Sequence, residues 1–197
     1  MHYLVVWSAI IAVTGMLFYI VSILKRHTKP HRVTRLVATV ILGLGTIGLY
    51  SAGDFSTFYV YCIYTSFSFA IFLLTLWHGV GGWTKTDIIC LCVALCGIIV
   101  WQVSSHAIIA VFASIIASFI GTVPAFIKTY ESPKTEYWVY YFCNIPSNLL
   151  IFFAHDTYTF SNSVFPLYYV AWNVLFLYFI FHKKIRIFFV RNLQSGL

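Results

Sequence analysis

A series of long apolar segments, separated by short polar connections, constrains the fold of this chain more than any other feature. Seven segments follow one another, each near the ~20 residues that a helix needs to cross the hydrocarbon core of a bilayer. They cover approximately residues 3–24, 36–52, 57–77, 87–103, 106–129, 137–154 and 160–181. The sequence therefore predicts an all-α integral membrane protein with seven transmembrane helices.

All 12 Lys and Arg residues fall on one side of the membrane when these segments are threaded through it in order. They occupy or flank the first, third and fifth connections and the C-terminal tail: Lys25, Arg26, Lys29, Arg32, Arg35, Lys85, Lys128, Lys134, Lys183, Lys184, Arg186 and Arg191. An excess of Lys and Arg marks the cytoplasmic side of a membrane protein. We therefore expect the N-terminus outside and the C-terminus in the cytoplasm.

The composition excludes several classes of protein. The chain is 61% hydrophobic and 9% charged, which is atypical of a soluble domain. Its formal net charge of +7 indicates anchoring beside anionic lipid headgroups, and we expect no nucleic-acid partner. The five cysteines fall inside the apolar segments without a close-spaced ligand motif, so we expect neither disulfides, nor a metal, nor a cofactor. The expected location is a plasma (inner) membrane, as a multi-pass protein.

Two parts of the chain resemble each other at an offset of 103 residues. At this offset Lys25 aligns with Lys128 and Pro30 with Pro133. The loop KRHTKPHRVT aligns with KTYESPKTEY without a gap. Such internal similarity predicts a duplicated structural unit.

The expected domains follow from this duplication. They are a first three-helix repeat at 1–78, a linker with the fourth helix at 79–105, a second repeat at 106–182 and a basic cytoplasmic tail at 183–197. Three spans invert the direction of the chain, and the extra fourth span restores it, so the two repeats are expected to be parallel. Transporters use such parallel repeats and hold their substrate near the midplane between the halves.

The 3+1+3 arrangement and the stretch GTVPAFIKTYESPKTEYW resemble the SWEET and PQ-loop superfamily. In this resemblance Pro124 is the helix proline and Lys128 the lysine near the helix end. The family's Gln is replaced by Ala125, and its sugar-carrying members' tryptophans have no clear counterpart. The resemblance implies a membrane transporter. The same helix count is similar to bacterial proteins that take up nicotinamide riboside, so sugar and nucleoside-like cargo both stay open.

The sharpest polar cluster is CNIPSNLL in the sixth segment. Asn144 and Asn148 lie four residues apart and share one helical face. Pro146 between them removes a backbone donor. Two carboxamides offer donors and acceptors to a neutral polar ligand. The alternative is that both asparagines bond neighbouring helices, as polar residues in membrane bundles do.

The seventh segment supplies a second group of candidates. Tyr169 lies four residues before Asn173 on the same face, and Trp172 precedes Asn173. An amide beside an aromatic plane suits a hydroxyl-rich or ring-shaped solute, and the family resemblance also implies an Asn near the middle of each repeat's third helix. The corresponding part of the first repeat contains Tyr61, Tyr64, Ser66 and Ser68 as candidate lining residues.

Prolines and outer acidic residues are candidates for moving parts. Pro124, Pro146 and Pro166 are expected hinges, with static curvature as the alternative. Asp54 and Asp156 occupy equivalent outer connections and are a candidate outer gate, with solvated loop charges as the alternative.

Two further sequence features concern helix packing and the location of charged residues. Gly45 and Gly48, three residues apart, are expected to allow close helix approach. Charged residues are expected at the edges of the spans, and the polar content within the spans is neutral. Since mid-membrane charges mark ion-coupled sites, this pattern favours passive movement of a solute.

The sequence as a whole predicts a transporter or facilitator for a small neutral polar solute, such as a sugar or a nucleoside-like or vitamin-like compound. Two three-helix halves would alternate access to a central site. The expected partners are this solute and membrane lipids, and homo-oligomer formation stays open. A membrane receptor or sorting protein on the same scaffold is the alternative. We expect no enzyme, because no trio of His, acid and nucleophile converges in the sequence.

Overall fold

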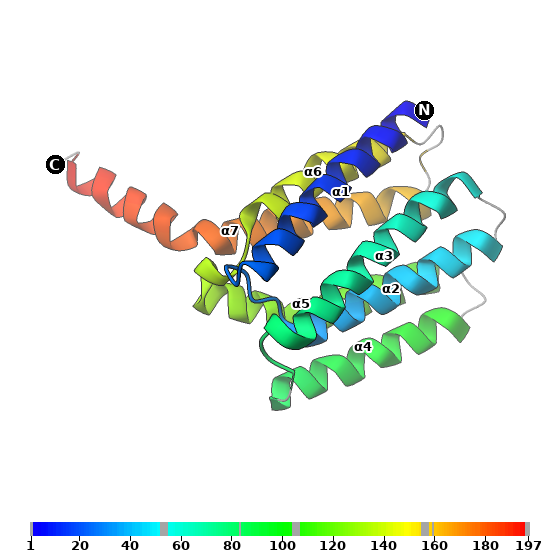
Figure 1. Cartoon of the computed structure of the whole chain (residues 1–197), viewed down its shortest axis with the longest axis horizontal. Helices are drawn as coiled ribbons and strands as arrows, with labels where there is room; N and C mark the ends of the chain where they lie inside the picture. The colour runs from blue at the N-terminus through cyan, green and yellow to red at the C-terminus, as the bar shows by residue number, and fades with distance from the viewer. Residues whose placement is uncertain are drawn as a thin grey trace.

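The computed structural model describes residues 2–51, 55–82, 84–103, 107–154, 158 and 160–195 (Figure 1). Its helices are α1 (His2–Leu24), α2 (Arg32–Ser51), α3 (Phe55–His78), α4 (Lys85–Val103), α5 (Ala107–Glu131), α6 (Trp138–Phe153) and α7 (Phe160–Ser195), with a 3-10 turn at Pro133–Thr135. The described residues contain no β-strand, so the all-α prediction is confirmed over them.

Three helical segments are long and apolar enough to cross a membrane on their own. They are Tyr3–Leu24, Phe58–His78 and Ser163–His182. The chain therefore contains helices compatible with a membrane, while seven spans and their orientation stay predictions. One physical reason for the smaller number is length, since α6 has only 16 residues and a bilayer crossing needs about 20.

Helix α7 differs from the prediction at its C-terminal end. We expected a span ending at residue 181 and a separate tail, but the helix continues to Ser195 and has 36 residues. At 1.5 Å per residue it is about 54 Å long, which exceeds the ~30 Å hydrocarbon core. Figure 1 shows its last part leaving the bundle. The expected tail is thus a continuation of the last helix.

The helices alternate in direction along the chain. Figure 1 shows α1, α3, α5 and α7 starting at the end of the bundle where the N-terminus lies, and α2, α4 and α6 starting at the opposite end. The connections at 25–31, 79–84 and 132–137 therefore share this opposite end. We call it the basic end, because Lys25, Lys29 and other cations predicted to be cytoplasmic lie there.

The helices pack as two triplets with the same internal order. In the first triplet α3 contacts both α1 and α2, and in the second α7 contacts both α5 and α6. The triplets meet where α1 contacts α6 and where α2 contacts α5, and α4 packs outside against α5 and α2. Exchanging α1 with α5, α2 with α6 and α3 with α7 therefore leaves the pattern of contacts among these six helices unchanged.

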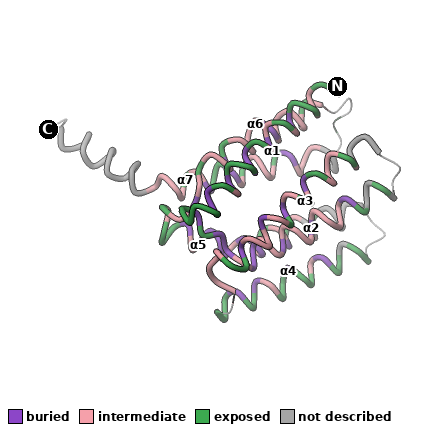
Figure 2. Tube along the Cα trace, in the orientation of Figure 1, coloured by how far each residue is buried: buried purple, intermediate pink, exposed green. Residues whose placement is uncertain are grey.

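Apolar side chains fill the spaces between helices and also cover much of the outer surface. Buried clusters join α1 to α3, α2 to α4 and α5, and α5 to α6 and α7. Figure 2 shows exposed positions along the outward faces of the helices. Many are large and apolar, among them Trp7, Leu17, Ile89, Val100 and Ile116. An exposed apolar surface of this extent is typical of helices that face lipid.

Two glycines allow the triplets to approach each other closely. A Cβ atom added to Gly15 of α1 would lie 2.8 Å from Cys143 Cβ on α6, and one added to Gly121 of α5 would lie 2.6 Å from Val37 Cγ1 on α2. The prediction of close approach at Gly45 is wrong, because a Cβ atom there would meet nothing within 4 Å. The side-chain environment of Gly48 lies outside the described residues.

The connection between α1 and α2 is tied to the one between α3 and α4. Val80 N donates to Pro30 O at 2.9 Å, and Arg32 N donates to Val80 O at 3.0 Å. His31 Nε2 lies 3.2 Å from Asp87 Oδ1. Gly81 has a φ of +76° and its added Cβ would collide with the imidazole of His31, so only glycine fits there. We call this set of contacts the strap.

The strap predicts a loss of stability on acidification. His31 is buried, and burial lowers its pKa from the ordinary 6.5; Asp87 and Glu136 oppose this shift, whereas Lys128 and Arg32 add to it. A pKa lower in the folded than in the unfolded state stabilises the fold fully above about pH 6.5, and this contribution is lost as the pH falls towards the folded pKa. The melting temperature of the purified protein should therefore decrease as the pH is lowered below about 6.5.

Substitution of His31 by Gln tests this assignment, and the exposed His27 supplies the matched control. The His31→Gln protein should show a weaker pH dependence of its melting temperature over this range, and the His27→Gln protein should behave like the wild type. A His31→Gln profile parallel to that of the wild type would show that another group is responsible.

Candidate solute-binding cavity

A cavity of about 170 Å³ lies between the two triplets. Six helices line it, namely α1, α2, α3, α5, α6 and α7, and α4 contributes no residue. For comparison, an apolar cavity of ~150 Å³ holds one benzene molecule. The space therefore suits a small solute of roughly six to ten non-hydrogen atoms.

Residues at matching positions of the two triplets line this cavity. Between α1 and α5 and between α2 and α6 the matching positions lie 106 residues apart: Ala12 and Ser118, Met16 and Thr122, Thr34 and Tyr140, Arg35 and Tyr141, Ala38 and Asn144, Ile41 and Ser147, Leu42 and Asn148. Between α3 and α7 they lie 108 residues apart: Tyr61 and Tyr169, Tyr64 and Trp172, Ser68 and Phe176. The two glycine contacts between the triplets keep the same spacing. Gly15 lies 106 residues before Gly121, and their contact partners Val37 and Cys143 are also 106 residues apart.

This spacing differs from the 103 residues that the loop sequences indicate. The shift of three residues is nearly one helical turn. The alignment of the loops therefore pairs residues on similar helix faces but displaces them by about one turn along the helix axis. With the spacing found for α3 and α7, the residue that matches Asn173 is Thr65 rather than Ala70. Matching of the helices is set by packing across the cavity, which a comparison of loop residues does not detect.

The matching positions differ in polarity between the triplets. Helices α1 and α2 provide mostly apolar side chains: Ala12, Met16, Ala38, Ile41 and Leu42. At the same positions α5 and α6 provide polar ones: Ser118, Thr122, Asn144, Ser147 and Asn148. One wall of the cavity is therefore apolar and the facing wall is polar.

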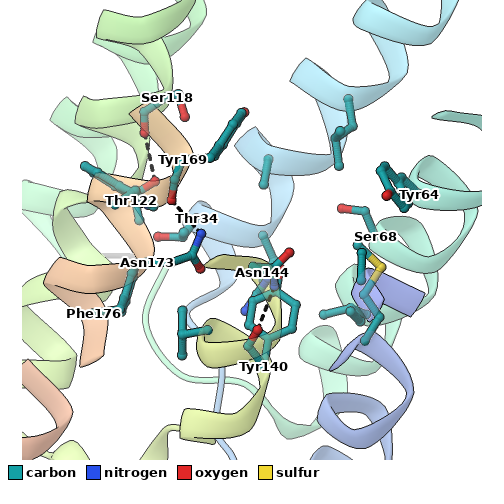
Figure 3. Close-up of a pocket in the computed structure, with 18 of the residues that line it drawn as sticks. Thr34, Tyr64, Ser68, Ser118, Thr122, Tyr140, Asn144, Tyr169, Asn173 and Phe176 are labelled. Carbon is teal, nitrogen blue, oxygen red and sulfur yellow. Dashed lines mark hydrogen bonds between the residues drawn. The ribbon is translucent and has the colours of Figure 1, made fainter. Parts of the chain in front are cut away.

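The three predicted asparagines all line the cavity, and each donates one hydrogen bond within its own helix. Asn144 Nδ2 donates to Tyr140 O at 2.7 Å, and Asn148 Nδ2 donates to Asn144 O at 2.7 Å. Asn173 Nδ2 donates to Tyr169 O at 2.6 Å, and Figure 3 shows Asn144 and Asn173 beside the open space. Because a backbone carbonyl only accepts, the amide nitrogen must be the donor, which leaves each amide oxygen as an acceptor for a ligand.

This geometry decides between two interpretations of the sequence. Asparagines that joined neighbouring helices would bond across the helix interface, but the hydrogen bonds of all three stay within α6 or α7. Among the described residues, Asn144 and Asn148 therefore do not join α6 to a neighbouring helix, as the alternative supposed. Hydroxyl groups do join neighbouring helices here: those of Ser8 on α1 and Ser147 on α6 lie 3.0 Å apart.

The predicted aromatic residues also lie at the cavity. Tyr61, Tyr64, Tyr169 and Trp172 line it. The Tyr64 hydroxyl is buried near Ser8 and Ser147 but makes no hydrogen bond of acceptable geometry, so it is a free polar group on the wall. A buried hydroxyl without a partner costs free energy, which a bound polar solute would recover.

The two serines of α3 that were predicted to line the cavity differ in their position. Ser68 lines the cavity and its hydroxyl lies 2.9 Å from that of Thr39. Ser66 is exposed, donates to Cys62 O within its own helix and does not line the cavity, so its assignment is wrong. The proposed outer gate of Asp54 and Asp156 lies outside the described residues.

Charged residues at the basic end of the cavity were missed by the sequence analysis. Arg35 and Glu136 both line it, so the expectation of an uncharged lining is wrong. Glu136 accepts hydrogen bonds from Lys128 Nζ at 2.6 Å, from Tyr141 at 2.9 Å and from Tyr19 at 3.0 Å. Both charged residues directly precede apolar segments, so the sequence analysis placed them in the loops between spans. The signal that could have found Glu136 is the rarity of carboxylates, with Asp and Glu numbering 5 in the chain.

Arg35 lies between two aromatic rings. Its guanidinium carbon is 4.5 Å from the ring centroid of Tyr19 and 5.1 Å from that of Tyr140, distances at which cation–π attraction operates. Arg35 Nη1 also donates a long 3.4 Å hydrogen bond to the Tyr140 hydroxyl. Within the described part of the chain, no carboxylate lies within salt-bridge distance of Arg35.

These contacts close the cavity at the basic end. Tyr19 from α1, Arg35 from α2 and Tyr140 from α6 meet there, and Glu136 joins them to Lys128 on α5. The backbone of Lys29 also donates to Thr135 O at 3.0 Å, which ties the two basic loops together. The cavity is therefore closed by side-chain contacts at this end.

Comparison of the chain with protein-family models, with curated proteins and with solved structures finds no match. The likeness to the SWEET and PQ-loop superfamily therefore stays an expectation from the sequence.

Proposed function

We propose that the protein is a membrane carrier that moves a small polar solute through the cavity between its two helix triplets. The observation that carries this proposal is the pattern of the lining. Matching positions of both triplets converge on one space, and three carboxamides line that space, their oxygens accepting no hydrogen bond from any described residue. A protein that only docks partners on its surface has no need of such a lining.

The lining indicates the chemistry of the solute. Amide oxygens of Asn144, Asn148 and Asn173 accept hydrogen bonds from hydroxyl or N–H groups. The facing wall of Ala38, Ile41 and Leu42 suits an apolar side of the solute. Sugar-like and nucleoside-like compounds both combine these features, and the volume of about 170 Å³ favours small sugar-like compounds over the larger nucleosides.

The mechanism that we propose is alternating access by rocking of the triplets. The two glycine contacts between triplets supply close, smooth surfaces about which α1 and α6, and α2 and α5, can pivot. Pro124, Pro146 and Pro166 lie within α5, α6 and α7 and provide points where these helices can bend. Opening at the basic end would separate Arg35 from Tyr19 and Tyr140. No ion coupling and no cofactor is part of this mechanism.

Uptake into liposomes tests the proposal. The purified protein is reconstituted and screened with labelled sugars, nucleosides and other small polar solutes. For a solute that is taken up, Asn148→Ala and Asn173→Ala should each lower the initial rate by about fivefold, because each removes a hydrogen bond of roughly 1 kcal/mol to the solute.

Ser66→Ala is the matched control for these variants, because Ser66 is a polar residue of α3 that faces away from the cavity. It should leave the rate unchanged. Uptake that survives both asparagine substitutions would remove our site assignment. A folded protein that takes up no solute would instead favour the receptor or sorting alternative.

A further inference from the structure

The positive charge of Arg35 at the cavity has no carboxylate within salt-bridge distance among the described residues. Arg35 and Glu136 line the cavity at the basic end, Lys128 lies beside them, and Asp87 at the same end pairs with His31. Lys128 Nζ bonds directly to Glu136 Oε1 at 2.6 Å, so this pair is neutral as a unit. Glu136 Oε2 is occupied by the hydroxyls of Tyr19 and Tyr141. The guanidinium of Arg35 is left to aromatic rings and one long hydrogen bond.

From this we propose that the transported solute carries a carboxylate, which binds the guanidinium of Arg35 inside the cavity. This inference rests on the proposed carrier function and narrows its substrate class. It replaces the uncharged solute expected from the sequence by a small carboxylate whose remaining polar groups face the asparagines.

The surroundings of Arg35 favour a planar anion. A guanidinium presents N–H donors around the edge of its plane, in a fork that matches the two oxygens of a carboxylate. The rings of Tyr19 and Tyr140 lie near the guanidinium without covering its edge, where Nη1 makes only the long hydrogen bond to the Tyr140 hydroxyl. A buried cation without an anion is costly, and the aromatic contacts offset only part of that cost.

The rest of the lining restricts the body of the solute. Farther along α6 and α7 from the basic end, Asn144, Asn148 and Asn173 offer amide oxygens, which accept from hydroxyl groups. The volume of about 170 Å³ limits the solute to roughly six to ten non-hydrogen atoms. Small hydroxy acids satisfy all three conditions: a carboxylate for Arg35, hydroxyls for the asparagines and a compact carbon skeleton for the apolar wall.

The test compares each acid with its neutral amide on the full-length protein in nanodiscs. The probes are lactate with lactamide and glycerate with glyceramide, and binding is followed by tryptophan fluorescence, since Trp172 lines the cavity. Each acid should bind the wild type roughly 10- to 100-fold more tightly than its amide, as expected for hydrogen bonds to a charged group.

Variants at position 35 separate charge from geometry. Arg35→Gln should abolish the preference for the acid, and Arg35→Lys should keep only part of it, because an ammonium supplies charge without the fork. Lys25→Gln, which removes an exposed cation at the same end, should keep the full preference. The comparison of acid and amide on the wild type decides the question even if a variant at position 35 does not fold.

The outcomes distinguish this inference from the carrier proposal. Equal binding of acids and amides, or an unchanged preference in folded Arg35→Gln protein, would overturn the role of Arg35. Uptake of neutral solutes that depends on Asn148 and Asn173 would in that case still support the carrier. If folded wild-type protein binds none of the probes and takes up no solute in liposomes, both proposals fall.

Discussion

Glu136→Ala protein is expected to lose about 3–5 kcal/mol of unfolding free energy, the largest effect we expect from a single substitution. Glu136 is buried, and its removal leaves the ammonium of Lys128 without its carboxylate partner. The hydroxyls of Tyr19 and Tyr141 lose their acceptor at the same time. A buried charge whose partner has been removed keeps its full desolvation cost, which is why breaking such a pair costs more than the pair itself contributes.

Thermal and denaturant unfolding in detergent measure this loss. Lys134→Ala, which removes an exposed charged side chain two residues before Glu136, is the control and should change stability by no more than about 0.5 kcal/mol. The double variant Lys128→Met/Glu136→Gln should recover much of the loss, because it removes the unpaired charge as well. Wild-type stability of Glu136→Ala would mean that Lys128 reaches water or another partner, and that the basic end is not sealed as described.

Gly121→Leu protein should be destabilised by about 3 kcal/mol, at the upper end of the usual cost of overpacking. A Cβ atom at this position would already lie 2.6 Å from Val37 Cγ1 and 3.0 Å from Val37 Cβ. A leucine adds three more carbons in the same place, so α2 and α5 must separate. Since this interface is one of two that join the triplets, the separation also widens the cavity.

The same measurement on Gly45→Leu provides the control, because a Cβ atom added there meets nothing within 4 Å. It should be neutral or mildly stabilising. Adding Val37→Ala to Gly121→Leu should restore part of the stability, since it removes the nearest colliding atoms. If Gly121→Leu is as stable as Gly45→Leu, the close packing of α2 against α5 is wrong.

Much of the fold follows from local sequence. Long apolar segments with polar connections determine where helices form, and the helix starts of α4 and α6 lie within two residues of the predicted segments. The spacing of four residues between Asn144 and Asn148 places both on one helix face whatever the fold around them. Their common position on the cavity wall is therefore the part of the site that sequence reasoning reached most directly.

Other parts of the site required the tertiary structure. Ser66 and Ser68 lie two residues apart, about 200° around a helix, so their side chains point in nearly opposite directions and cannot both face one cavity. Which of them faces inward depended on where α1 and α2 pack against α3. The register between the triplets, 106 residues rather than 103, was likewise set by contacts such as Gly121 with Val37, which join residues remote in sequence.

The amino-acid sequence by itself determined the helices, the grouping of positive charge at one end and the polar face of α6, because these depend on residues close together in the chain. Only the tertiary structure decided that Glu136 pairs with Lys128 while Arg35 is left with aromatic rings. The physical reason is that burial and pairing of a charge depend on three-dimensional neighbours. A charge that a linear pattern places in a solvated loop can therefore become part of a cavity wall.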